Sequence, residues 1–179
     1  MHGPSISPAQ RRTIRNDVQL QVISKSETHH AGALGPVLLT YWRAAPSVEV
    51  IRSRRQWFAD GLTKYEAFGL LIVVEGNTGF TLPNLAFARE SRSQLQLIRE
   101  RPGFGGLVVE GTGVVRSLVR TFTRGQGRAT KGAHHNKSFL SAEGASNWIG
   151  ARLAPWDGPS GAEIFNAANA LRALPYDTL

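Results

Sequence analysis

Short apolar runs spaced along the chain restrict its fold more than any other feature of the sequence. The run Gly69–Val74 is continuous and bounded by glycines, as expected of a central strand covered on both faces of a sheet. Val37–Trp42 and Phe104–Val109 are two further runs of strand length. Because stretches with helical spacing separate these runs, the sequence predicts an α/β layer with mostly parallel pairing and right-handed crossovers.

Two weaker strands complete a mixed, mostly parallel sheet of about five strands. In Val18–Ile23, apolar residues alternate with glutamines, which predicts a half-buried strand. Lys137–Leu140 is expected to form a last short strand. Ser24–Gly35 is interpreted as a turn or loop.

About four helices are expected around this sheet. The first covers Ser47–Tyr65 with Ser47 as its N-cap, and the second covers Asn84–Arg101. The third follows Gly113, and the fourth begins at Ser141. The residues expected on the buried stripes of the first two helices are Val50, Ile51, Trp57, Phe58, Leu62, Tyr65, Leu85, Ala88, Leu95 and Ile98.

Arg54 falls on the otherwise apolar stripe of the first helix. Two interpretations stay open: its guanidinium snorkels past the edge of the core, or it pairs with an acid such as Glu75. Snorkelling is the preferred interpretation.

The chain is expected to consist of one domain with two tails. Residues 1–17 are polar and basic and predict a flexible tail, residues 18–153 form the domain, and residues 154–179 form a C-terminal extension. In the extension, Ser160 and Glu163 form a capping box for a short amphipathic helix. This helix is expected to dock on its own domain; the alternative is that it serves a partner.

Composition narrows the class of protein. The 179 residues contain no cysteine, which excludes disulfides and thiolate metal sites. No apolar run is long enough to span a bilayer or to serve as a secretory signal, so a cytoplasmic location without membrane insertion is expected. The net charge of +8 makes an anionic partner possible, and the preferred alternative is that the excess arginine only keeps the protein soluble.

Several segments resemble the SpoIIAA-like branch of the STAS family in their arrangement. They are Val37–Trp42, Leu70–Val74, Leu107–Val109 and Ser138–Ile149, and the last resembles the strand-to-helix ending common in these domains. The resemblance covers roughly residues 18–153 and rests on hydrophobic pattern and element order. It implies a STAS fold with a curved mixed sheet and helices on one side, and a regulatory module that binds partner proteins rather than catalysing a reaction.

The resemblance also points to a phosphorylation site. In anti-sigma antagonists of this type, a partner kinase phosphorylates a serine at the start of the helix after the central strand. The matching residues 75–84 lack the usual Asp-Ser-Ser-Gly sequence, and Thr78 and Thr81 are the hydroxyls present there. Both threonines are therefore candidate phosphorylation sites, and plain turn residues are the alternative.

A second candidate site lies further along the chain. Gly111, Thr112 and Gly113 precede a predicted helix, where free backbone N–H groups favour a phosphate. The basic residues that follow at four-residue steps on one helix face are Arg116, Arg120 and Arg124. They form either an anion-binding ridge, continued to residue 131, or a solvated polar face.

The histidines are the candidate metal-binding and catalytic residues of the sequence. His29-His30 and His134-His135 are adjacent pairs, whose imidazoles diverge, so no metal or other cofactor is expected. An enzyme with an atypical site built on His134 and Glu110 is the weakest hypothesis.

The leading hypothesis is a non-enzymatic STAS-like module for protein binding in intracellular signalling, which contacts its partner through a sheet edge or the loops at the strand ends. The alternative is a binding protein for a phosphorylated ligand or nucleic acid through the basic ridge around residues 111–131.

Overall fold

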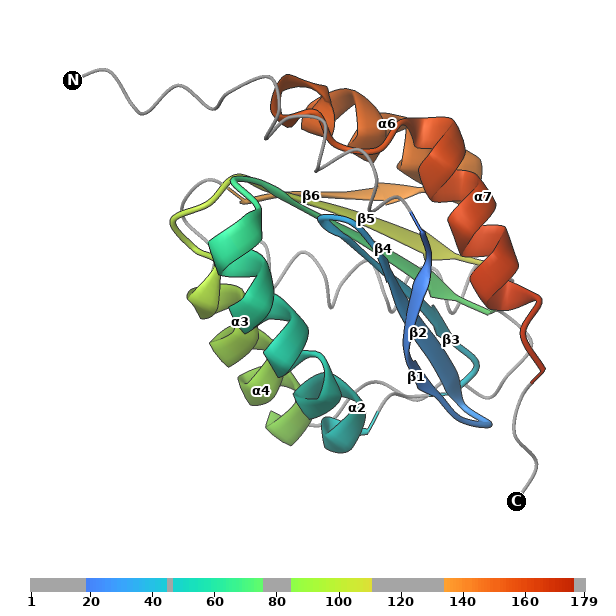
Figure 1. Cartoon of the computed structure of the whole chain (residues 1–179). Coiled ribbons are helices and arrows are strands. Elements are labelled where there is room, and N and C mark those ends of the chain that lie inside the picture. Colours follow the sequence, from blue (N-terminus) through green and yellow to red (C-terminus); the bar gives the residue numbers. More distant parts are fainter. Residues whose placement is uncertain (1–18, 45–46, 76–84, 111–133, 176–179) are drawn as a thin grey trace.

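A mixed six-stranded sheet separates two layers of helices (Figure 1). The structure is a computed structural model, and it describes residues 19–44, 47–75, 85–110 and 134–175. The strands are β1 (Gln21–Lys25), β2 (His29–Leu34), β3 (Val37–Trp42), β4 (Phe68–Val74), β5 (Gly103–Val109) and β6 (His134–Phe139), and they lie in the sheet in sequence order. Strands β1 to β3 pair antiparallel, whereas β3 to β6 pair parallel.

The helices cover both faces of the sheet (Figure 1). One layer contains α2 (Val48–Ser53), α3 (Arg55–Lys64) and α4 (Leu85–Leu97). The other contains α6 (Ala142–Leu153), α7 (Gly161–Arg172) and a 3-10 turn, η1 (Ala154–Trp156). Right-handed crossovers between parallel strands that follow in order place the connecting helices on one face of the sheet. The α6 and α7 helices come after the last strand and cover the other face of the sheet. The α/β class is confirmed, and the expectation of helices on one side is wrong.

The predicted loop at Ser24–Gly35 contains a strand instead, which raises the strand number from about five to six. Every residue of β2 is buried. A Cβ on Gly32 would come within 2.9 Å of the Gln21 carbonyl oxygen and 3.2 Å of the Leu171 side chain. Close packing of α7 on this strand therefore requires small residues, and small residues give no strand signal in the sequence.

The predicted helix Ser47–Tyr65 is divided at Arg54 into α2 and α3. Ser47 is the N-cap, as expected, and its hydroxyl accepts a hydrogen bond from the Val50 N–H. At the break, the Ile51 carbonyl accepts hydrogen bonds from the Arg54 N–H and from the buried side-chain amide of Gln94 on α4. The amide from α4 thus provides a donor for a carbonyl at the helix end.

The predicted stripe of the first helix is largely correct, and that of the second is correct only at Ile98 among its described side chains. Val50, Ile51, Phe58 and Ile98 are buried, and Trp57, Leu62 and Tyr65 pack beside them. Leu85 is an error, since its side chain is 78% exposed and Phe87 is buried in its place. The inward face of α4 follows positions 87, 94 and 98, so the pattern began at the wrong residue.

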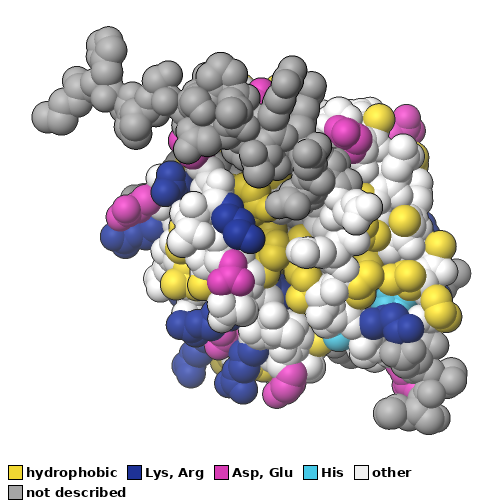
Figure 2. Space-filling view, viewed as in Figure 1, with side chains coloured by type: hydrophobic (Ala, Val, Ile, Leu, Met, Phe, Trp, Pro, Cys, Tyr) yellow, Lys and Arg dark blue, Asp and Glu magenta, His cyan; other side chains and the backbone are white. Residues whose placement is uncertain are grey.

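The core lies on both sides of the sheet. One cluster joins β3, β4 and β5 to α6 and α7, and the fully buried Ile164, Ala168 and Leu171 of α7 belong to it. The α7 helix begins with the predicted capping box of Ser160 and Glu163 and docks on its own domain, as expected. Two smaller clusters lie under α2, α3 and α4. Figure 2 shows hydrophobic side chains gathered between the layer of α2, α3 and α4 and strand β1.

Candidate functional site

Charged residues follow directly after three neighbouring parallel strands. Trp42, Val74 and Val109 are aligned at the ends of β3, β4 and β5, and the next residues are Arg43, Glu75 and Glu110. The Glu75 N–H donates to the Trp42 carbonyl and the Glu110 N–H to the Val74 carbonyl, both at 2.9 Å, so pairing continues to this point. Ligands of open α/β sheets bind at the carboxyl ends of strands. We call these three residues and Arg172 of α7 the carboxyl-edge cluster.

Ion pairs connect all four members of the carboxyl-edge cluster. Arg43 Nε lies 2.9 Å from Glu75 Oε2, and Arg172 Nε lies 3.5 Å from Glu75 Oε1. Arg172 also makes a two-pronged contact, with Nη1 2.9 Å from Glu110 Oε1 and Nη2 2.7 Å from Oε2. Parallel contacts of this kind are the stronger and more directional arginine–carboxylate geometry.

The electrostatics of Arg172 reflect these contacts. Burial alone would lower the pKa of this guanidinium, but the hydrogen bond and the charge of Glu110, together with Tyr41 and Glu75, outweigh burial and raise it. The guanidinium carbon lies 5.6 Å from the centre of the Tyr41 ring, which adds a cation–π contact. Arg172 is therefore held as a cation between two acids.

The adjacent histidines His29 and His30 diverge, as expected, because successive side chains on a strand point to opposite faces. His30 reaches α7, where its Nδ1 lies 3.0 Å from the Leu171 carbonyl. His29 faces the other way, and its ring nitrogens lie 2.6 Å from Ser26 Oγ and 3.1 Å from Ser24 Oγ. Burial, followed by the charges of Arg54 and His30, lowers the pKa of His29 to about 4.

Arg54 lies on the same side as His29 and is almost wholly buried, with 3% of its surface exposed. Its guanidinium carbon lies 5.8 Å from the centre of the Trp42 ring. Burial lowers the pKa of Arg54 to about 9. The snorkelling interpretation is wrong, and so is the pairing with Glu75, which is held by Arg43 and Arg172.

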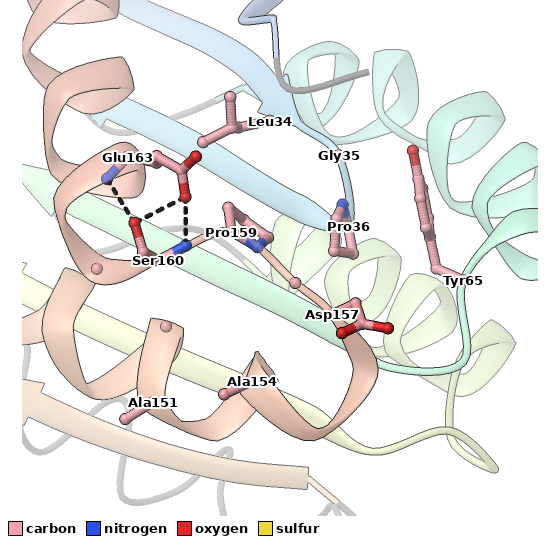
Figure 3. A pocket seen from close by; sticks show the side chains of 13 residues that line it. Leu34, Gly35, Pro36, Tyr65, Ala151, Ala154, Asp157, Pro159, Ser160 and Glu163 are labelled. Carbon is pink, nitrogen blue, oxygen red and sulfur yellow. Dashed lines mark hydrogen bonds between the residues drawn. The ribbon is translucent and has the colours of Figure 1, made fainter. Parts of the chain in front are cut away.

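A cleft of about 620 Å³ lies at the opposite, amino end of the parallel strands (Figure 3). It is lined by the turn between β2 and β3, by Tyr65, and by the segment that joins α6 to α7. Of its polar groups, Ser160 and Glu163 are bonded to each other in the capping box, as the dashed lines in Figure 3 show. Their hydrogen bonds serve the start of α7, so the cleft is a weaker candidate than the carboxyl-edge cluster.

The candidate site residues predicted from the sequence do not come together in the described structure. The proposed phosphorylation sites and anion site lie outside the described residues: Thr78, Thr81, Gly111, Thr112, Gly113, Arg116, Arg120 and Arg124. The pair His134 and Glu110 is separated by the strand register, since His134 is aligned with Gly103 at the other end of β5. Seven residues of strand place their backbones roughly 20 Å apart.

Three members of the carboxyl-edge cluster carry a signal that sequence reasoning missed. Arg43, Glu75 and Glu110 each stand immediately after a predicted apolar strand, and parallel strands bring such positions together. Arg172 carried no such signal, because it lies 62 residues from Glu110.

Within the part of the chain that the structure describes, no group of three or more histidine or acidic side chains is arranged to hold a metal ion. The described helices include none with the length and apolarity needed to cross a membrane. Comparison with protein-family models and with curated proteins found no match for this chain.

Proposed function

We propose that this protein is a non-enzymatic, STAS-like regulatory module that binds a partner protein in intracellular signalling, in the cytoplasm, through the carboxyl end of its parallel strands. The observation that carries the proposal is the pairing of charges in the carboxyl-edge cluster. Both acids at the strand ends are held by arginines, so they serve recognition better than proton transfer.

The cluster is suited to recognition because its charges are partly exposed and fixed in position. The side chains of Arg43 and Arg172 are each 43% exposed, and that of Glu110 is 32% exposed. Alternating fixed charges at the rim of an interface select a partner by electrostatic complementarity and guide its approach. The α/β class, with its mixed and mostly parallel sheet, agrees with the STAS resemblance, whereas the helices on both faces depart from it.

The experiment that tests the proposal is a quantitative affinity capture with three forms of the full chain. The wild type, Arg43→Ala and Arg99→Ala are compared, because Arg99 is an exposed arginine outside the cluster, paired only weakly at 3.8 Å with Glu100. The expected result is one protein that is enriched by wild type and Arg99→Ala and depleted by Arg43→Ala. The captured protein is then purified and titrated against the same three forms.

Two outcomes contradict the proposal. One is equal binding of the purified partner by all three forms, which would show that the carboxyl-edge cluster does not contact the partner. The other is turnover of a metabolite by the purified chain, which would show that the protein is an enzyme.

A further inference from the structure

The most unusual side chain outside the carboxyl-edge cluster is Arg54. It lies at the junction of α2 and α3, under the helix layer, with 3% of its surface exposed. Arginine is almost never buried without a partner, because removing its charge from water costs several kcal/mol that only a counter-charge and hydrogen bonds offset. A reason for its burial is therefore required.

No ion pair joins Arg54 to an acid among the described residues. Glu90 of α4 lies 3.9 Å from Arg52 and 3.7 Å from Arg55, and its own buried Oε1 makes no hydrogen bond in the described part of the chain. Glu75 belongs to the carboxyl-edge cluster. Burial is the resolved cause of the lowered pKa of Arg54, without an opposing contribution from an acid.

Hydrogen-bond donors of Arg54 are unused as well. Among the described residues, its buried Nε and Nη2 atoms have no acceptor. These two atoms form one edge of the guanidinium, and their N–H bonds run parallel, which is the fork that binds two oxygens of a carboxylate or phosphate. The indole Nε1 of Trp42, beside the guanidinium, is likewise buried without an acceptor in the described part of the chain.

The two unused donor groups belong to one apolar neighbourhood. Trp42 is 6% exposed and packs with Ile51, Val74 and Phe87 in one cluster. Its ring meets that of Phe87 edge to face, with centroids 5.8 Å apart. In such surroundings, a hydrogen bond to an ionised group is stronger than in water, so an anion that reached these donors would gain from both.

We propose that Arg54 anchors a binding site for an oxyanion, the phosphate or carboxylate group of a small ligand, with the Trp42 indole N–H as a further donor. The guanidinium edge binds two oxygens of the group, and the anion supplies the counter-charge that the described residues do not. This site lies on the opposite face of the sheet from Arg172.

Nitrogen-15 NMR of the arginine Nε–H groups tests the site in the wild-type full chain. The probes are inorganic phosphate and acetate, each compared with sodium chloride at the same ionic strength. The expected result is a saturable shift of the Arg54 Nε–H resonance with phosphate, with acetate or with both, and the stronger probe identifies the oxyanion. A response equal to that of chloride overturns the proposal.

Two substitutions sharpen the test. Arg54→Lys keeps the charge and removes the fork, so binding is expected to weaken about tenfold or more, and Arg54→Met is expected to abolish it. Arg55→Met, at an exposed neighbour, is the matched control and should bind as wild type does. Equal binding by wild type and Arg54→Met would show an adventitious ion only, bound elsewhere.

His29 gives a second readout that needs no variant. The charge of Arg54 and that of His30, after burial, lower its pKa to about 4, while Ser24 and Ser26 bond its ring. A bound oxyanion offsets the charge of Arg54, so the pKa of His29 is expected to rise when phosphate or acetate binds. An unchanged pKa of His29 at saturating probe places the anion away from Arg54 and contradicts the proposal.

Discussion

Replacing Arg54 by methionine is expected to stabilise the protein in a buffer without phosphate or carboxylate. Methionine fills a similar volume, adapts to irregular packing and carries no charge. Replacement of a buried charge by an apolar residue of similar volume is often neutral or stabilising. The direction is the opposite of the usual effect of a substitution at a buried position.

The magnitude follows from the lowered pKa. Burial lowers the pKa of Arg54 from its ordinary value to about 9. At about 1.4 kcal/mol per unit, the charged side chain destabilises the folded state by at most about 5 kcal/mol. The substitution also removes the cation–π contact with Trp42, worth about 1 to 2 kcal/mol when desolvated. A net gain of at most about 3 to 4 kcal/mol in the free energy of unfolding is therefore expected.

The gain depends on pH in a defined direction. The folded state releases the Arg54 proton from about pH 9, whereas the unfolded chain retains it to a much higher pH. Between these values the unfolded state binds more protons, so the stability of the wild type rises with pH relative to the variant. The advantage of Arg54→Met is thus full below pH 9 and declines above it.

Urea unfolding followed by tryptophan fluorescence in Tris chloride measures both effects. Arg55→Met is the control, because Arg55 is 56% exposed and its distant contact with Glu90 contributes little. If Arg54→Met is less stable than wild type while Arg55→Met is unchanged, the guanidinium makes stabilising contacts and the reasoning is refuted.

Three further expectations follow from the structure. The pKa of His29 is about 4 in the folded state against 6.5 in model compounds, so its contribution to the free energy of unfolding, up to about 3 kcal/mol, is present above pH 6.5 and lost as pH falls through 4. His29→Gln should therefore flatten this part of an acid-unfolding curve, and an unchanged curve contradicts the reasoning. Glu110→Gln should lower the free energy of unfolding in urea by about 0.5 to 1 kcal/mol, and by less at high salt, because it weakens the ion pair with Arg172. An equal loss from the exposed control Glu100→Gln would show that this ion pair is not the cause. Gly150→Ala should lower thermal stability by about 3 kcal/mol, because its Cβ would meet the α7 backbone, whereas Gly144→Ala in the same helix should be neutral or better; similar effects at both sites would refute the packing argument.

The parts of the fold that sequence predicted well are those in which burial and composition agree. Val37–Trp42 coincides with β3, and the runs at Gly69–Val74 and Phe104–Val109 lie within β4 and β5. These strands are covered on both faces, so apolar residues occupy consecutive positions and the signal is strong. The start of α6 was equally clear, since Ser141 is its N-cap and accepts from the Gly144 N–H at 3.1 Å.

The parts that sequence could not predict depend on contacts between distant segments. Strand β2 is built from small residues and histidines because α7, well over a hundred residues later, packs on it. The break at Arg54 coincides with a hydrogen bond from Gln94 on another helix. For the same reason the sequence marks Arg54 as an exception but does not predict its burial, because the exposure of a charged residue on an apolar stripe depends on what covers it.

The contact between His30 and Leu171 has a consequence for how the protein reaches its fold. The two residues are 141 positions apart, and α7 fills the core over β2 and β3, which are formed near the start of the described chain. Contacts over such separations slow folding, because a long loop is closed before they contribute. On the ribosome, the β1–β3 segment therefore waits with one apolar face uncovered until α7 has emerged, and during that interval it is the part of the chain most open to chaperones and to aggregation.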